Sequence, residues 1–97
     1  MPPNSDPAVT TTVTTAAADV VLPAHLHARP AGDLARAAAG FRSSVTLRHQ
    51  DRAVDAAGIL AVLGLGATAG STVTLRAEGP DAEEAVRALA EILAEAE

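Results

Sequence analysis

His27 and Arg29 are the residues of this chain whose types and spacing best suit a chemical role. They stand in the run Leu26-His27-Ala28-Arg29-Pro30-Ala31, at the expected junction between an extended segment and an alanine-rich helix. A neutral imidazole is a nucleophile near pH 7, and a phosphoryl group attached to it stays easy to transfer. The first N–H groups of a helix have no partner within it, and with a neighbouring guanidinium they can bind an anion. The run therefore indicates a histidine that carries phosphate.

Both residues also have a plain structural interpretation. His27 can be an exposed histidine that serves as an indifferent helix cap, and Arg29 can be a solvated residue of the first turn. A cation near the positive end of a helix is unfavourable, however, so Arg29 is easier to explain if it serves an anion. The Arg-Pro-Ala sequence that follows His27 favours the phosphate-carrying interpretation.

Composition excludes several classes of protein. The chain has 97 residues, a formal net charge of −5, one aromatic residue other than histidine, and no cysteine. This length holds a single domain with a modest core. An acidic chain without stacking aromatics lacks the usual means of binding nucleic acid. Disulfides and thiolate metal sites need cysteine, and three histidines without clustered carboxylates predict no metal site.

The sequence shows no targeting or membrane-spanning segment. Its start lacks the basic end and apolar stretch of a signal peptide, and no run of roughly 18 apolar residues occurs. Residues 1–12 mix proline, asparagine, serine and threonine with little to bury. We therefore expect a flexible tail over 1–12, one domain over 13–97, and a cytoplasmic protein that does not insert into membranes.

The hydrophobic pattern predicts the elements that hold His27 and Arg29 in place. A first strand is expected from Val13 to Leu22, before Pro23, which cannot donate to a strand ladder. A helix is expected over 28–39, because apolar residues recur there at helical spacing. Gly40 is expected to end this helix in the left-handed conformation.

The rest of the chain predicts a hairpin, a short helix, a strand and a last helix. The strands of the hairpin are 44–48 and 52–54, with His49 at its tip and solvent-exposed. Asp55 is expected to cap a helix over 56–63 that Gly64 and Gly66 stop. Further elements are a strand over 71–77 and a helix with Pro80 in its first turn and an apolar stripe at Ala82, Val86, Leu89 and Leu93.

The order β-α-β-β-α-β-α predicts an α+β fold. We expect a two-layer, open-faced sandwich with a four-stranded antiparallel sheet and three helices on one face. The second helix has more apolar residues than a core-facing stripe requires, among them Ile59, Leu60 and Leu63. The surplus favours an exposed patch for partners, and the alternative is a short helix fully buried in an alanine-rich core.

From about Val13 to Glu97 the sequence resembles the HPr family, the histidine-containing phosphocarriers of the bacterial phosphoenolpyruvate-dependent sugar phosphotransferase system. The run Leu26–Ala31 matches the family's active-site signature, and Leu60–Gly66 is similar to the region around its second helix. The resemblance implies a stoichiometric carrier rather than an enzyme, without a cofactor. Enzyme I, charged by phosphoenolpyruvate, would phosphorylate Nδ1 of His27, and His27 would pass the group to IIA domains of sugar permeases.

The resemblance also implies roles for neighbouring residues. Arg29 would counter the charge of the phosphate, and the N–H groups of Ala28 and Arg29 would bind its oxygens. Pro30, which has no N–H, sits in a first turn where none is required. The surface shared by enzyme I and the IIA domains would include Ile59, Leu60, Leu63 and Arg36.

Three residues depart from the pattern of the family. His25 stands where a glycine is usual, either as tolerated loop variation or as a second imidazole that shifts the pKa of His27 or hydrogen-bonds its phosphate. Gly58 stands where many relatives carry a serine phosphorylated by a dedicated kinase, so no regulatory serine is expected. Asp33 adds a negative charge to a surface that is usually neutral or basic.

Other functions stay open at this point. A regulatory adaptor could keep the fold and act by docking on a transcription factor or an enzyme. A carrier could also belong to a nitrogen-related branch or to a single dedicated kinase system. An independent hydrolase or transferase is disfavoured, because the sequence has no second general base, paired carboxylates or nucleotide loop. A monomer is expected, since a carrier presents one face to its partners in turn.

Overall fold

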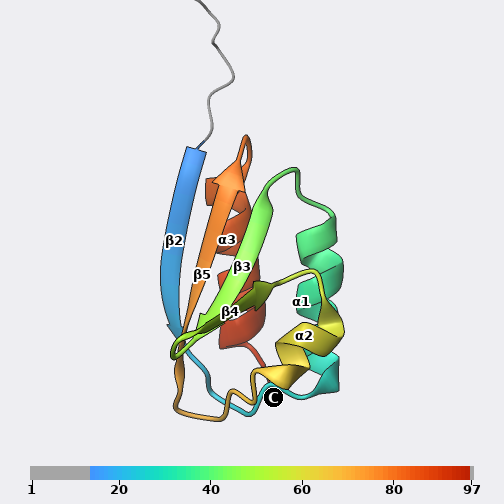
Figure 1. Ribbon diagram of the computed structural model, residues 1–97, viewed down its shortest axis with the longest axis vertical. Coiled ribbons are helices and arrows are strands. Elements are labelled where there is room, and N and C mark those ends of the chain that lie inside the picture. The colour runs from blue at the N-terminus through green and yellow to red at the C-terminus, as the bar shows by residue number, and fades with distance from the viewer. Residues whose placement is uncertain (1–13, 97) are drawn as a thin grey trace, which may run out of the picture.

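The computed structural model describes residues 14–96 of the chain. The expected tail over 1–12, together with Val13 and Glu97, lies outside these residues. In chain order the elements are β2 Thr14–Val21, α1 Ala28–Ala39, β3 Ser44–His49, β4 Arg52–Asp55, α2 Ile59–Gly64, β5 Thr72–Gly79 and α3 Ala82–Ala94 (Figure 1). The predicted order of strands and helices is confirmed.

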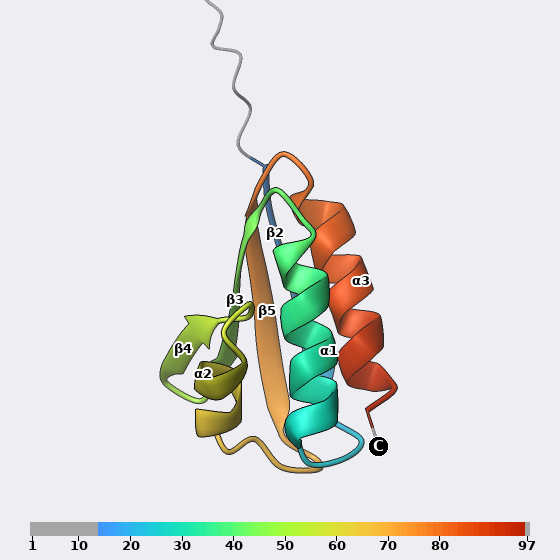
Figure 2. The same cartoon turned by 90° about the vertical axis from the view of Figure 1, so that its right-hand side faces the viewer.

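The strands form one antiparallel sheet in the order β2-β5-β3-β4. Helices α1 and α3 run in opposite directions side by side over one face of it, and α2 lies beside α1 at the β4 end (Figure 2). Along β5 the side chains of Val73, Leu75 and Ala77 are buried, while those of Thr72, Arg76 and Glu78 are exposed. This alternation confirms a two-layer sandwich whose sheet has one covered and one open face.

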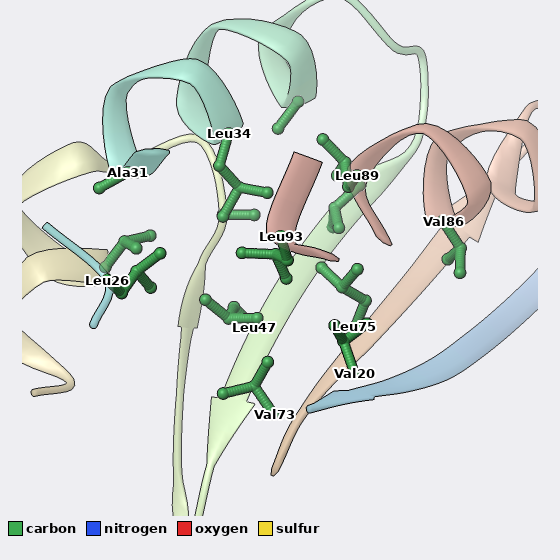
Figure 3. Packing of buried hydrophobic residues seen from close by; sticks show 14 of the residues in the cluster. Val20, Leu26, Ala31, Leu34, Leu47, Val73, Leu75, Val86, Leu89 and Leu93 are labelled. Carbon is green, nitrogen blue, oxygen red and sulfur yellow. The ribbon is translucent and has the colours of Figure 1, made fainter. Parts of the chain in front are cut away.

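The core lies between the sheet and its helices. Leu34 of α1 and Leu89 and Leu93 of α3 face Leu47 and Leu75 of the sheet, and all five are fully buried (Figure 3). Burying a leucine contributes roughly 1.5 to 3 kcal/mol, so Leu34 fixes α1 firmly against the sheet. The expected stripe of α3 is also confirmed, since its four residues are all buried.

Helix α1 has the predicted bounds, but its expected ending is wrong. Gly40 has φ −83° and ψ −9°, which is right-handed backbone. Its N–H donates to the carbonyl of Ala37 at 3.1 Å, and the Phe41 N–H donates to that of Ala38 at 3.2 Å. The helix therefore ends in a tightened last turn, which satisfies the terminal carbonyls without a left-handed residue.

Two predictions for the hairpin and the short helix are also wrong. His49 is the last residue of β3 and is half-buried, and the turn is made by Gln50 and Asp51, with Gln50 at φ +59°. Helix α2 starts at Ile59 instead of residue 56, because Asp55 ends β4 and holds a turn. Its carboxylate accepts the Ala57 N–H at 2.9 Å, a local turn that competes with helix formation.

The last strand is longer than predicted. It reaches Gly79 because its far end pairs on both sides, with Thr14 opposite Gly79 and Ser44 opposite Glu78. Helix α3 consequently starts at Ala82, and Pro80 precedes the helix instead of standing in its first turn.

Candidate functional site

His27 is the N-cap residue of α1, directly before Ala28. Its backbone is extended, with φ −80° and ψ −179°, and its carbonyl accepts the Ala31 N–H at 3.0 Å. Its own N–H donates to the carbonyl of His25 at 2.9 Å. The side chain is exposed and makes no hydrogen bond to any residue the structure describes. The backbone of His27 is thus held firmly, while both nitrogens of its imidazole stay available.

The first turn of α1 offers two unused donors next to this imidazole. Ala31 is the first residue of the helix whose N–H is bonded within it. The N–H groups of Ala28 and Arg29 have no partner among residues 14–96, and Pro30 has no N–H. Two free N–H groups at the positive end of a helix form a site suited to an anion.

Arg29 lies at the edge of a hollow of about 400 Å³ between the start of α1 and the end of α3. The hollow is also lined by Pro30, Asp33, Ile92, Glu95 and Ala96. Arg29 is exposed and forms no ion pair with the part of the chain that the structure describes. Its guanidinium is therefore free to turn toward an anion bound at His27.

The loop that follows α2 is hydrogen-bonded to the segment that leads into His27. Segment 22–26 and segment 67–71 run side by side at the bottom of Figures 1 and 2. The Leu26 N–H donates to the carbonyl of Ala67 at 3.1 Å, and the buried Leu26 side chain anchors the turn into α1. The position of His27 therefore depends on contacts with residues some 40 positions further along the chain.

His25 takes part in this support. Its Nδ1 accepts the Ala69 N–H at 2.9 Å. Its ring meets that of His27 edge to face, with centroids 5.6 Å apart and planes at 79°. The sequence marked His25 as unusual, but its bond to Ala69 was missed, because no local pattern joins residues 44 positions apart.

The expected docking residues lie at different depths. Leu60 is 80% exposed and Ile59 is 40% exposed, whereas Leu63 is half-buried against the core. The alternative of a fully buried second helix is therefore wrong. A Cβ built on Gly32 of α1 would lie 3.4 Å from Ile59 Cδ1 and 3.5 Å from the guanidinium of Arg36, so these side chains adjoin on one surface.

Two of the residues that depart from the family pattern, Asp33 and Gly58, belong to this surface or lie next to it. Arg36 forms an exposed ion pair with Asp33, one turn away on α1, so part of its positive charge is neutralised. Gly58 is the N-cap residue of α2 and offers no side-chain cap. Within the described part of the chain, no group of three histidine or acidic side chains is arranged to hold a metal ion. The helices described here are also too short or too polar to cross a membrane.

An open-faced α+β sandwich that exposes a histidine at the start of its first helix defines a class, the small histidine phosphocarriers. A family model described as "PTS HPr component phosphorylation site" matches residues 14–95. The chain therefore belongs to the HPr family, the phosphocarriers of the phosphotransferase system.

Individual relatives agree with this family. The chain is similar to the phosphocarrier protein HPr of Lysinibacillus sphaericus, with 41% identity over 76 residues, 78% of this chain and 86% of the relative. It is 45% identical to that of Cupriavidus necator over 69 residues, 71% of this chain and 78% of the relative. The crystal structure of HPr from Bacillus anthracis matches with a TM-score of 0.73 and 32% identity, over 84% of this chain and 96% of that one.

Proposed function

We propose that His27 accepts a phosphoryl group from phospho-enzyme I on its Nδ1 and donates it to IIA domains of sugar permeases. One observation carries this proposal. The exposed imidazole of His27 makes no hydrogen bond with the described residues, and it is followed in the chain by two N–H groups and a guanidinium that are likewise without partners among residues 14–96. These are the groups that a transient phosphohistidine needs.

The transfer needs only a neutral imidazole with a free Nδ1. The lone pair of Nδ1 attacks the phosphorus, the new nitrogen–phosphorus bond forms, and the bond to the donor breaks with its electron pair returning to the donor. The ring proton stays on Nε2. A nucleophile on the IIA domain then repeats the displacement, so the carrier is restored after each cycle and no external base is required.

The start of α1 would stabilise the phosphate that is carried. The N–H groups of Ala28 and Arg29 would bind two of its oxygens, and the Arg29 guanidinium would bind a third. Since these donors bond nothing else among the described residues, no existing interaction must break first. Donors set in place before the reaction lower its barrier because they need not reorganise.

The partners would dock on the surface that α1 shares with α2. Exposed apolar side chains near the centre of such a surface contribute most to binding, which favours Leu60 and Ile59, with Leu63 and Arg36 at its edges. The Arg36–Asp33 pair would weaken attraction to acidic partners. Because Gly58 has no hydroxyl, phosphorylation of a serine cannot regulate docking at that position.

The proposal is tested by intact mass after incubation with enzyme I, magnesium and phosphoenolpyruvate. We expect one acid-labile phosphoryl group on the unsubstituted protein and none on His27→Ala. His49→Ala is the matched control, because His49 lies in β3, outside the site, and this variant should be phosphorylated normally. No mass gain with an active cognate enzyme I would refute phosphoryl transfer and favour the regulatory adaptor.

A further inference from the structure

His25 is the one unusual residue next to His27, and its side chain joins two segments of the chain. Segments 22–26 and 67–71 are tied by the backbone bonds Leu22 N–H to Ser71 O, Gly70 N–H to Leu22 O, and Leu26 N–H to Ala67 O, at 2.8 to 3.1 Å. Between them, the Ala69 N–H donates to Nδ1 of His25 at 2.9 Å. The imidazole thus takes the place that a backbone carbonyl would occupy in a regular ladder.

This bond fixes the state of the His25 ring. A ring nitrogen that accepts a hydrogen bond carries no proton, so the proton of His25 is on Nε2 and the ring is neutral while the bond lasts. A glycine at this position would leave the Ala69 N–H without this acceptor. His25 therefore satisfies a backbone donor that the loop otherwise exposes.

The same ring is in contact with His27. The two rings meet edge to face at 5.6 Å, a favoured geometry for aromatic pairs. His27 has no side-chain hydrogen bond to the described residues that would orient its ring. Its N–H, in addition, donates to the carbonyl of His25. His25 thus contacts His27 in two ways, through a backbone hydrogen bond and through its ring.

The loop that His25 holds continues directly from α2. Residues 65–71 follow Ile59–Gly64, the helix proposed above to contact partners. Resting on the proposed function, we propose that His25 is a positioning residue. By accepting the Ala69 N–H at Nδ1, it locks this loop to the turn before α1 and holds the His27 ring ready for phosphoryl transfer.

Three substitutions separate the hydrogen bond from the ring. His25→Ala removes both. His25→Phe keeps an aromatic ring beside His27 but has no acceptor for Ala69. His25→Asn loses the ring, but its Oδ1 lies about where Nδ1 does and can accept the same N–H. His49→Ala, which alters a histidine outside the site, is the control for general effects.

The first measurement is the single-turnover rate of phosphoryl transfer from phospho-enzyme I. We expect His25→Ala and His25→Phe to be about threefold to tenfold slower, the range that one neutral hydrogen bond typically contributes. His25→Asn should recover most of the rate, and His49→Ala should not change it. A fast rate in His25→Phe would show that ring packing orients His27, and equal rates in all variants would show that His25 is tolerated variation. Either result overturns the proposal.

The second measurement does not need enzyme I. Hydrogen exchange of the Ala69 amide should be slow in the unsubstituted protein and in His25→Asn, and fast in His25→Ala, at unchanged global stability. Fast exchange in the unsubstituted protein would overturn the lock itself. If the amide is protected but the unsubstituted protein accepts no phosphoryl group, the proposed function has failed, and the positioning role fails with it. If the Ala69 amide is protected but His25→Ala transfers the phosphoryl group at the unsubstituted rate, only the positioning role is overturned.

Discussion

Helix α1 begins with a cation and with N–H groups that have no partner in the described part of the chain, whereas helix α3 begins among carboxylates. The first turn of α1 has no acidic residue and contains Arg29. Helix α3 has Asp81 as its first flanking residue and Glu83 and Glu84 in its first turn. Negative charge at the positive end of a helix is stabilising and positive charge is not, so only α3 is built for stability at this end.

The residues around the start of α3 are paired and tightly packed, and those around the start of α1 are exposed. The carboxylate of Asp81 accepts the Arg42 N–H at 2.8 Å and the Ser43 hydroxyl at 2.5 Å. Gly79 packs so closely on Ser43 that no side chain fits there. At the start of α1 there is instead an exposed imidazole, and Arg29, two residues further on, lies at the edge of a hollow. Polar groups already paired within the fold stabilise it, and unpaired groups are available to a ligand, so substitutions should affect transfer at α1 and stability at α3.

After the loss of His27 itself, substitution of Arg29 should have the largest effect on transfer. Loss of a donor that stabilises the charge of a transition state typically slows a reaction by about 10²- to 10³-fold, and we expect Arg29→Ala to slow phosphoryl transfer to this extent. Thermal stability should stay equal or rise slightly, because a cation is removed from the positive end of a helix. Transfer rates and thermal unfolding, measured on the same samples, check both parts.

Arg87→Ala is the matched control for this experiment. Arg87 is an exposed residue of α3 that forms no ion pair with the described residues, so its loss changes the net charge equally. Its transfer rate should stay close to that of the unsubstituted protein. Equal slowing in the two variants would mean that net charge, and not a guanidinium at the start of α1, assists transfer.

Substitution of Gly79 should have the largest effect on stability. Gly79 has φ +151°, and a Cβ on it would lie 2.6 Å from the Cα of Ser43, a backbone atom that cannot easily move. Strained backbone and overpacking together predict that Gly79→Ala lowers the free energy of unfolding by about 2 to 4 kcal/mol. Denaturant unfolding measures this change.

Gly64→Ala is the control, because a Cβ there meets nothing within 4 Å and the residue is helical. This substitution should raise stability by about 0.5 kcal/mol, since alanine favours a helix more than glycine does. A loss of similar size in both variants would contradict the idea that the turn before α3 is tightly filled.

The sequence predicted most where a pattern repeats along the chain. The bounds of α1 and the buried stripe of α3 follow from helical spacing of apolar residues, and the order of elements follows from the two periodicities. The start of α2 was misplaced because one carboxylate, that of Asp55, holds a turn where the pattern allowed a helix. A periodic signal cannot weigh such a local competition.

The candidate site shows the same limit. His27 and Arg29 are two residues apart, so the sequence was enough to place them together at a helix start. The bonds of His25 to Ala69 and of Asp81 to Ser43 join residues 44 and 38 positions apart. Such pairs depend on how loops meet after folding, which a single sequence does not encode in any local pattern.

Substitution of Asp81 should have the smallest effect on stability, and its dependence on pH tests whether the charge of the carboxylate is responsible. The Ser43 hydroxyl, followed by the Arg42 N–H, lowers the pKa of the Asp81 carboxyl below its ordinary value of 3.8. The folded state therefore favours the charged form. The stabilisation it gives is complete above about pH 4 and is lost as the pH falls through the lowered pKa of the folded state.

Asp81→Asn should accordingly lower the midpoint of thermal unfolding by a few degrees at pH 7, because an amide has one oxygen and can accept only one of the two hydrogen bonds that the two carboxylate oxygens accept. As the pH falls from 5 to 2.5, the midpoints of the two proteins should converge, since protonation of Asp81 removes what the substitution has already removed.

Asp51→Asn is the control, because Asp51 is exposed in the β3–β4 turn and its carboxylate has no hydrogen-bond partner among residues 14–96. Its midpoint should follow that of the unsubstituted protein over the whole range. If the gap between Asp81→Asn and the unsubstituted protein does not narrow in acid, the charge of Asp81 is not what stabilises the start of α3. The contrast with α1 would then rest on packing at Gly79 alone. Transfer at pH 7 should be unchanged in Asp81→Asn, because the two helix starts act independently.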